Sequence, residues 1–180
     1  MATPAHRRPR VAVDMDGVLA DAELALLRCN EAETGRRIER DDLLRVPERD
    51  LRRWVETPGF FRRLPLIPGS VEGVRTLMET FEVFIVSAAT EFPLSLHEKH
   101  EWLGEHFPFI PWTHVVFCGD KTIIQADYLI DDHPRNLDPF QGVPLMFTAC
   151  HNRLVDRHRR VNDWGEVLRY FEGVPRDGRP

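Results

Sequence analysis

Residues 11–21, Val-Ala-Val-Asp-Met-Asp-Gly-Val-Leu-Ala-Asp, constrain the fold of this chain more than any other stretch. Three apolar residues that favour β-strands lead directly into Asp14 and Asp16, and Gly17 follows. Residues two apart in an extended chain point to the same side, so the two carboxylates can face one pocket. A glycine lets the backbone turn sharply and leaves room for a close approach. The pattern predicts a buried strand with a ligand site at its carboxyl end, where open α/β sheets bind ligands.

Two interpretations of Asp14 and Asp16 are open at this point. An Asp-Gly pair after a strand is also a common turn, in which neither carboxylate needs a function. If the two carboxylates do share a pocket, their repulsion has to be relieved by a cation or by a shared proton. A hard cation that prefers oxygen ligands, such as Mg²⁺, meets this requirement.

The composition excludes several classes of protein. A chain of 180 residues, 42% of them hydrophobic, is long enough for one core with a small appended lobe. The net charge of -5 argues against a general nucleic-acid surface, and no apolar run approaches the roughly 20 residues of a membrane span. Cys29, Cys118 and Cys150 form no Cys-x-x-Cys pair, which is typical of free thiols in a reducing compartment. Because residues 1–10 lack an apolar signal-peptide core, we expect a cytoplasmic protein.

Helical and strand patterns alternate along most of the chain. After residue 65, the expected helices are 70–78, 94–106 and 163–171, and the expected strands are 81–86, 114–118, 126–130 and 143–147. This alternation predicts an α/β, Rossmann-like three-layer fold, in which a parallel sheet is covered on both faces. We expect Ser70 to be the N-cap of its helix, and Pro144 to place its strand at a sheet edge.

The segment 22–65 interrupts this alternation directly after the first strand. Helical patterns cover residues 22–33 and 41–56, and a loop with Pro58 and Gly59 follows. The position of the insert predicts a small helical cap over the carboxyl edge of the sheet. The core would then comprise residues 8–21 and 66–175. The alternative is that these helices simply pack against the flank of the sheet.

Arginine supplies nearly all of the positive charge. Of the 24 basic residues, only Lys99 and Lys121 are lysine. A compact ammonium differs physically from a planar guanidinium, so such a chain has some reason to keep a lysine. The arginine-rich segment 153–160 is expected to be a solvated face.

Polar residues follow each of the first four strands. In chain order they are Asp14 with Asp16, then Ser87, then Lys121, and finally Asp131 with Asp132. Taken singly, Ser87 could be a turn residue, Lys121 a solvated side chain, and the segment 131–134 a polar loop. A parallel sheet, however, brings all four strand ends to one edge. Their order therefore predicts one shared site of carboxylates, a hydroxyl and an ammonium group.

This order resembles the four motifs of the haloacid dehalogenase superfamily, to whose phosphatases the chain is similar from residue 11 to about residue 150. Several segments look more narrowly like the 5'(3')-deoxyribonucleotidases, which have a small helical cap in the same place. These segments are Asp-Met-Asp-Gly-Val-Leu-Ala-Asp at 14–21, Pro-Gly-Phe-Phe at 58–61, Pro-Gly at 68–69, Gly-Asp-Lys-Thr at 119–122 and Ala-Asp-Tyr-Leu-Ile-Asp-Asp at 126–132.

The chain departs from that family's pattern in two places. Human-type members carry a Ser-Pro pair and a nearby lysine where this chain has Ala-Ala-Thr-Glu at 88–91. They also carry an arginine where this chain has Gly119. In the family these positions touch the base and phosphate side of the nucleotide, so both departures concern the choice of substrate.

The resemblance implies a Mg²⁺-dependent phosphomonoesterase. Asp14 is expected to attack phosphorus and form an aspartyl-phosphate, while Asp16 protonates the leaving alkoxide and later takes a proton from water. Mg²⁺ would be held by Asp14, Asp132 and the backbone carbonyl of Asp16. Asp131 is expected to orient Lys121 or a metal-bound water. The expected substrate-binding residues are Ser87, Ala88, Lys121, Phe60 and Phe61, together with the backbone amides of Met15 and Asp16.

Three aromatic residues before the return to the core bear on the substrate. Trp54, Phe60 and Phe61 could form a platform on which a nucleobase stacks, or could simply join the cap to the core. We expect the substrate to be a (deoxy)nucleoside monophosphate, with deoxyribose and a pyrimidine as the specific hypothesis and with Phe60 or Phe61 against the base.

Two alternative functions are open. The chain could be a phosphatase of another small phosphate ester, or a non-catalytic binding protein of the same fold. The second would be free to lose Asp14 or Asp16, and both are present. The expected partner is a small-molecule phosphate ester, with no nucleic-acid polymer and no membrane, and a homodimer is possible.

Overall fold

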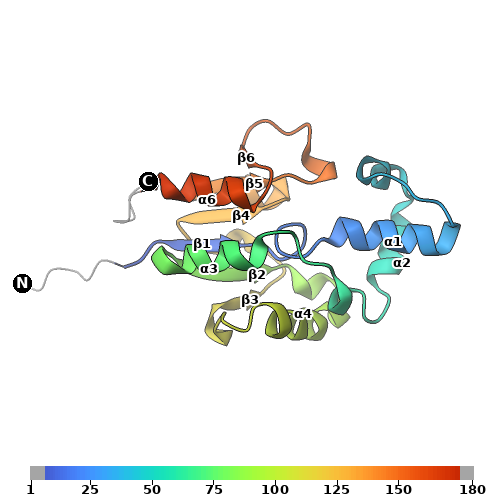
Figure 1. Cartoon of the computed structure of the whole chain (residues 1–180), viewed down its shortest axis with the longest axis horizontal. Coiled ribbons are helices and arrows are strands. Elements are labelled where there is room, and N and C mark those ends of the chain that lie inside the picture. The colour runs from blue at the N-terminus through green and yellow to red at the C-terminus, as the bar shows by residue number, and fades with distance from the viewer. Residues whose placement is uncertain (1–6, 175–180) are drawn as a thin grey trace, which may run out of the picture.

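The computed structural model describes residues 7–174 and contains one sheet of six parallel strands. The strands are β1 (Arg10–Val13), β2 (Glu82–Ser87), β3 (Val115–Phe117), β4 (Tyr128–Asp131), β5 (Val143–Phe147) and β6 (Arg159–Val161). They lie in the order β3-β2-β1-β4-β5-β6, so β1 is central, with β2 and β4 on its two sides (Figure 1). This order places the carboxyl ends of β1, β2 and β4 next to one another.

Alternation along β1 shows how the two faces of the sheet are covered. Val11 and Val13 belong to a core cluster that includes buried residues of α3 (Ser70–Thr80), α4 (Pro93–His106) and α6 (Trp164–Glu172). Ala12 points to the other face, where Leu137 of the short helix α5 (Pro134–Leu137) packs. Successive residues of a strand face opposite sides, and Val11, Ala12 and Val13 are all buried, whereas Arg10 at the start of β1 is partly exposed. The predicted α/β, Rossmann-like three-layer fold is confirmed.

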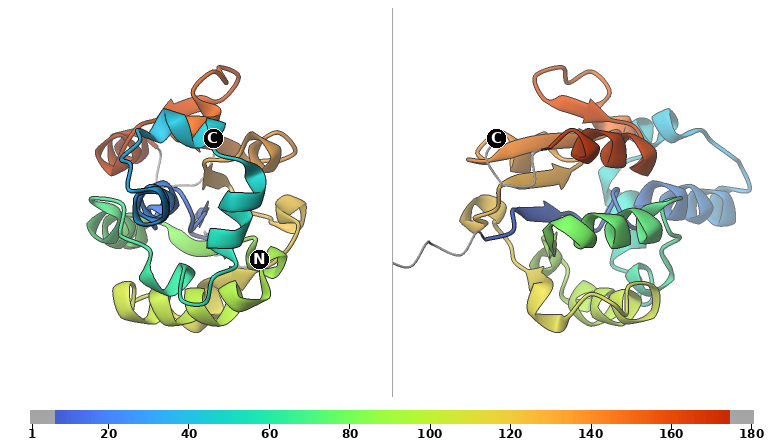
Figure 2. Two further views of the ribbon diagram at one scale, coloured as in Figure 1. Left: turned by 90° about the vertical axis from the view of Figure 1, so that its right-hand side faces the viewer. Right: turned by 60° about the vertical axis from the view of Figure 1, so that its left-hand side comes forward.

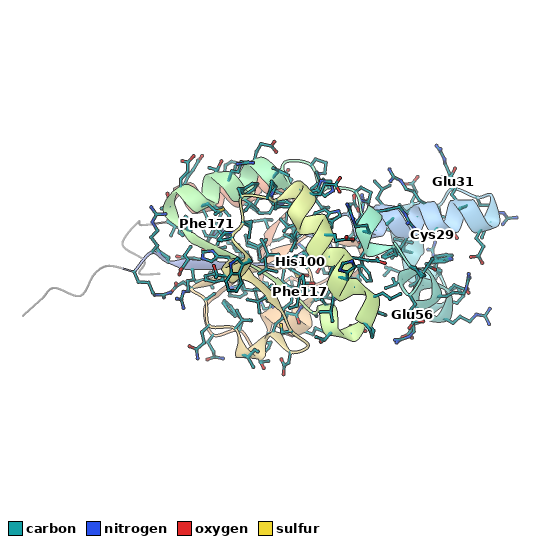
Figure 3. All side chains as sticks on the ribbon, turned by 90° about the horizontal axis from the view of Figure 1, so that it is seen from below. Cys29, Glu31, Glu56, His100, Phe117 and Phe171 are labelled. Carbon is teal, nitrogen blue, oxygen red and sulfur yellow. The ribbon has the colours of Figure 1, made fainter. Side chains whose placement is uncertain are left out.

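The segment between β1 and α3 extends from one end of the sheet (Figures 1 and 2). It contains α1 (Ala22–Thr34), α2 (Glu48–Val55) and two 3-10 turns, η1 (Arg40–Arg45) and η2 (Phe61–Arg63). Figure 3 shows Cys29, Glu31 and Glu56 on this extension, far from Phe171 at the opposite end. The segment lies beyond the carboxyl ends of the strands, as a cap would. Its status as a separate domain with the boundaries 22 and 65 stays a prediction.

Side-chain contacts at the base of α1 connect the extension to the core. Asp21 is the N-cap, and its carboxylate accepts from the amide of Leu24 at 2.9 Å and from the Arg40 guanidinium at 2.6 Å. Glu23 accepts from the backbone amide of Cys150 at 2.7 Å, on a loop that follows β5. These contacts fix the direction in which α1 leaves the sheet.

Four local expectations are wrong. The helical pattern at 41–56 divides into η1 and α2, because Pro47 interrupts it. Ser70 is the first residue of α3, and the N-cap is Gly69. Pro144 does not lie on an edge strand, because β5 pairs with both β4 and β6. The pairing of β5 with β6 begins only at Leu145, so the amide hydrogen that Pro144 lacks is not needed for a hydrogen bond to β6.

The fourth wrong expectation concerns the arginine-rich segment 153–160, which is only partly a solvated face. Residues 159–161 form β6, a strand that sequence analysis did not anticipate. The Arg160 guanidinium donates to the backbone carbonyls of Asn152 at 2.9 Å and Val155 at 2.6 Å. An arginine side chain can therefore supply hydrogen-bond donors to the backbone carbonyls of the loop before its strand. The charge of the residue alone does not predict this role.

Two further expectations can be compared with residues 7–174. All three cysteines are free, as the sequence predicts. Every helix in this range is too short or too polar to cross a bilayer.

Candidate active site

The loop after β1 presents Asp14 and Asp16 at the carboxyl edge of the sheet. The amide of Asp14 still donates to the carbonyl of Ile130 on β4 at 2.9 Å, so the ladder with β4 holds this residue. Gly17 has a φ of +78°, and a Cβ atom there would lie 2.3 Å from Oδ2 of Asp132. The predicted reason for this glycine, a sharp turn with a close approach, is confirmed.

Lys121 lies between two of the predicted carboxylates. Its Nζ is 2.6 Å from Oδ1 of Asp14 and 2.7 Å from Oδ2 of Asp131. The side chain is almost fully buried, and the turn that carries it follows β3. The two carboxylates raise the pKa of Lys121 against the opposing effect of burial, so this ammonium group is a fixed positive charge.

The Asp131-Asp132 pair at the end of β4 serves two different purposes. Asp131 accepts from Lys121, from the amide of His133 at 2.8 Å and from the Asn136 side chain at 3.0 Å. Its oxygens are therefore occupied, which matches the expectation that Asp131 orients Lys121. In contrast, Oδ1 of Asp132 is buried and has no hydrogen-bond partner among residues 7–174.

Asp14, Lys121, Asp131 and Asp132 together form the strand-end cluster. Oxygens of its three carboxylates lie within 4.8 Å of one another, and all three residues are buried. Burial raises the pKa of Asp14 to about 7; Asp131 and Asp16 also raise it, and Lys121 opposes the shift. Burial and the neighbouring Asp131 and Asp14 likewise raise the pKa of Asp132 well above its usual value. A single ammonium group does not balance this charge, and Asp132 has one buried oxygen without a hydrogen-bond partner among the described residues. The donor set suits a hard divalent cation.

Ser87 is the last residue of β2, and Ala88 follows it. Ser87 is fully buried, and its hydroxyl accepts from Nζ of Lys99 at 3.0 Å. Ala88 lines the cavity described next, as predicted. Lys99 lies on α4 and also donates to the carboxylate of Asp16.

A cavity of about 230 Å³ opens beside these groups. Asp14, Asp16, Lys99 and Lys121 line it together with three aromatic residues, Phe60, Phe61 and Phe92, which we call the cap-side wall. The rings of Phe60 and Phe61 meet edge to face at 5.2 Å, and that of Phe92 lies 6.0 Å from Phe61. Of the residues predicted for the site, six line this cavity, namely Asp14, Asp16, Ala88, Lys121, Phe60 and Phe61, whereas Ser87, Asp131 and Asp132 are buried and do not line it.

Trp54 does not belong to the cap-side wall. Its indole Nε1 donates to Glu33 of α1 at 2.8 Å, and the residue does not line the cavity. Phe60 and Phe61 line the cavity, but both are also buried in the core cluster that includes Val11 and Val13, so they join the cap segment to the core. Trp54 joins α2 to α1 within the extension. The stacking of a base on Phe60 or Phe61 stays a prediction.

The comparisons with known proteins agree with this geometry. A family model described as "5' nucleotidase, deoxy (Pyrimidine), cytosolic type C protein" matches residues 8–172. A protein of Staphylococcus epidermidis called a putative 5'(3')-deoxyribonucleotidase is 41% identical over 175 residues, which is 93% of this chain and 98% of that protein. The chain belongs to this family.

Another member, the 5'(3')-deoxyribonucleotidase of Bacillus subtilis, is 39% identical over 168 residues, covering 88% of this chain and 96% of that protein. A haloacid dehalogenase family hydrolase of Deinococcus radiodurans, solved with bound phosphate and sodium, has the same fold, with a TM-score of 0.59 at 16% identity and coverage of 93% and 97%. The predicted resemblance is confirmed, and the chain is a phosphoric monoester hydrolase of the 5'-nucleotidase type.

Sequence reasoning missed several residues of this site. Lys99 and Phe92 line the cavity from α4 and the turn before it, and only the scarcity of lysine pointed to Lys99. His133 also lines the cavity; its ring stacks on His151 at 4.2 Å, and burial lowers its pKa to about 4, assisted by the neighbouring His151. No spacing in the sequence indicates that these two histidines meet.

Of the two departures from the family's pattern, the segment 88–91 lines this cavity through Ala88 and Glu91, whereas Gly119 lines a second cavity that shares these two residues. Glu91 and Arg135 both line it, and their charged groups are 3.8 Å apart. At Gly119, a Cβ atom would lie 2.9 Å from the Thr90 hydroxyl, so Thr90 occupies the space that a larger side chain would need.

Proposed function

We propose that this protein hydrolyses deoxynucleoside monophosphates, with a pyrimidine base, in a Mg²⁺-dependent reaction through an aspartyl-phosphate. The carrying observation is a cavity that Asp14, Asp16 and Lys121 line together with the aromatic residues of the cap-side wall. The charged groups suit a phosphate, and the aromatic side chains suit a base. The names of the related deoxyribonucleotidases support the same substrate class.

Asp14 is the proposed nucleophile. Its Oδ1 is held by Lys121 at 2.6 Å, and the β1–β4 ladder fixes its backbone. A carboxylate oxygen of Asp14 forms a bond to phosphorus while the bond to the leaving oxygen breaks. Lys121 lines the cavity and is the proposed contact for the remaining phosphoryl oxygens, whose charge it would stabilise. We include the Ser87 hydroxyl as a second proposed contact, although it is buried and accepts from Lys99.

Asp16 is the proposed acid and base. Its side chain is 30% exposed, more than that of Asp14, and it lines the same cavity. A proton on its carboxyl passes to the leaving oxygen, and the resulting carboxylate takes a proton from the water that attacks the aspartyl-phosphate. Gly17, with a φ of +78°, lets the chain turn directly after Asp16.

Mg²⁺ fits the donor set of the strand-end cluster. The carboxylates of Asp14 and Asp132 and the backbone carbonyl of Asp16 would hold it, and the orphaned Oδ1 of Asp132 favours this arrangement. When bound, the ion offsets the repulsion between the nucleophile and the phosphate. Asp131 is not needed as a ligand, because its oxygens already accept from Lys121, His133 and Asn136.

The cap-side wall is the proposed contact for the nucleobase. Stacking of a base on an aromatic side chain contributes roughly 1–3 kcal/mol, which corresponds to about a 5- to 150-fold preference. Phe61 is the central ring of the three, since it contacts both Phe60 and Phe92.

The test compares kcat/KM for dTMP, dUMP, ribose 5-phosphate and p-nitrophenyl phosphate in the wild type and in Phe61→Leu. Leucine keeps the apolar volume but removes the aromatic face. We expect the nucleotides to be the better substrates, and their advantage over ribose 5-phosphate to fall about 5-fold or more in the variant. Trp112→Ala, which removes an aromatic ring that is 82% exposed, is the matched control and should change nothing. Equal rates for nucleotides and ribose 5-phosphate in the wild type would leave a phosphatase of another small ester.

A further inference from the structure

Lys99 is a buried charge that the phosphoryl-transfer steps above do not use. It is 2% exposed, although it lies on α4 rather than at a strand end. Burying a charged group is unfavourable unless the group is paired and hydrogen-bonded. Lys99 therefore needs a specific partner. It is one of only two lysines in the chain.

The partners of Lys99 are three groups of the active site. Its Nζ donates to Oδ2 of Asp16 and to the Ser87 hydroxyl, the latter at 3.0 Å. The ring of Phe61 lies 4.5 Å from the same nitrogen, at the centre of the cap-side wall. The two lysines are therefore divided between the two aspartates of the first motif: Lys121 contacts Asp14, and Lys99 contacts Asp16.

The contact leaves the two oxygens of Asp16 in different situations. Oδ2 is engaged by Lys99, whereas Oδ1 is buried and has no hydrogen-bond partner among the described residues. A carboxyl held by one oxygen has a fixed plane. An ammonium group can donate to a carboxyl oxygen whether or not the carboxyl carries a proton, so the contact does not exclude proton transfer.

Contacts of the neighbouring residues hold Lys99 in place. The Glu98 carboxylate accepts hydrogen bonds from two backbone amides of the turn that bears Phe60 and Phe61. These are the amides of Gly59 at 2.5 Å and Phe61 at 3.0 Å. At the start of α4, the Ser95 hydroxyl donates to the carbonyl of Ala89 at 2.6 Å, next to the end of β2. The helix is thus attached both to the cap turn and to the core, and Lys99 reaches Asp16 from a fixed position.

We infer that Lys99 is a positioning residue for Asp16, and that it holds the Asp16 carboxyl in the orientation from which it protonates the leaving oxygen. The inference rests on the proposed function, because it needs Asp16 as the acid. As the phosphorus–oxygen bond to the leaving group breaks, the proton on the Asp16 carboxyl passes to that oxygen, and the bond from Asp14 to phosphorus forms. The Asp16 carboxylate later takes a proton from the attacking water, while Lys99 keeps its own protons throughout.

The test uses leaving groups that differ in their need for a proton. A sugar alkoxide departs poorly without protonation, whereas p-nitrophenolate departs readily. We expect Lys99→Met to lower kcat/KM for dTMP at least about tenfold more than kcat/KM for p-nitrophenyl phosphate. His100→Gln, an exposed neighbour on α4 labelled in Figure 3, is the control and should behave like the wild type. An equal loss with both esters would show that Lys99 acts on the phosphate itself and would overturn the inference.

Asp16→Asn separates this inference from the proposed function. It should show the same leaving-group dependence, and Lys99→Met should add no further dependence in the Asp16→Asn background. If Asp16→Asn shows no such dependence, the acid assignment itself is wrong. If it does, and Lys99→Met alone does not, only the role of Lys99 is wrong. Lys99→Gln, whose amide can still donate to Oδ2, should retain part of the dTMP activity and covers the case in which Lys99→Met does not fold.

Discussion

Residues of the strand-end cluster and of the cap-side wall line the same cavity but are held in different ways. Asp14 and Asp131 lie at or next to the ends of paired strands, and Lys121 links them with two short ion pairs. Phe60 and Phe61 lie on a turn that contacts the core through Glu98, 37 positions later in the chain than Phe61. The cluster is thus part of the sheet, whereas the wall depends on contacts between separate segments.

This difference suggests a division of labour. Groups held by a β-ladder keep their geometry, which phosphoryl transfer requires. The turn that carries Phe60 and Phe61 is not part of the sheet, although both side chains pack in the core cluster that includes β1. We therefore expect substitutions in the cluster to affect every ester alike, and substitutions in the wall to change the preference among esters.

The largest effect is expected for Asp14→Asn. An amide cannot form the acyl phosphate, so kcat/KM should fall at least about a thousandfold for dTMP and for p-nitrophenyl phosphate alike. Circular dichroism should show an intact fold. The matched control is Asp156→Asn, an exposed aspartate outside the cavity, which should retain wild-type activity. Substantial turnover by a folded Asp14→Asn protein would contradict the covalent route.

Removal of the metal should have the next largest effect. EDTA should abolish turnover, Mg²⁺ should restore it, and Asp132→Asn should weaken this rescue on the order of a hundredfold. Mg²⁺ should also raise the Tm of the wild type, because it binds the folded state and relieves repulsion within the cluster. The Tm shift should be smaller in Asp132→Asn. Full activity in metal-free buffer would mean that the carboxylates serve another purpose.

Gly17→Ala tests the close approach at the centre of the cluster. The new Cβ atom would lie 2.3 Å from Asp132 Oδ2 in a backbone conformation with φ of +78°. We expect a loss of roughly 1–3 kcal/mol in the free energy of unfolding, measured by urea denaturation. Gly104→Ala is the control, since nothing lies within 4 Å of its Cβ position on α4, and it should be stabilising by up to about 1 kcal/mol. Equal stabilities for the two variants would argue against the packing described around Asp132.

The smallest effect is expected for Trp54→Phe. This change removes the hydrogen bond to Glu33 and should lower the free energy of unfolding by about 0.5–1.5 kcal/mol. The ratio of kcat/KM for dTMP to that for ribose 5-phosphate should stay unchanged, because Trp54 does not line the cavity. A fall in this ratio as large as that expected for Phe61→Leu would place Trp54 in the substrate site after all.

The strand-end cluster could be predicted from the sequence because its geometry follows from local rules. Apolar strands indicate where parallel strand ends meet, and Asp14, Ser87, Lys121 and Asp132 each lie at the end of such a strand or after it. The same rules predicted the close approach at Gly17. The sheet itself was predicted except for β6, whose Arg-Arg-Val sequence has too little apolar character to stand out.

Contacts made across segments could not be predicted in this way. Lys99 reaches Asp16 over 83 positions of sequence, and His133 meets His151 from two different loops. Neither contact leaves a local pattern, because a helix or loop position does not specify what packs against it. The shortage of lysine was a compositional hint to Lys99, and it gave no partner.

The central claim is that Asp14 carries the phosphoryl group while the cap-side wall only selects the ester. Asp16→Asn tests this claim most directly, because p-nitrophenyl phosphate can transfer its phosphoryl group without an acid, but hydrolysis of the intermediate then lacks its base. After an acid quench, mass spectrometry of the digested protein should find one phosphoryl group on the peptide with Asp14, in Asp16→Asn and equally in Asp16→Asn combined with Phe61→Leu. Release of p-nitrophenol with no phosphoryl group on the protein, or with the group on another residue, would contradict the account.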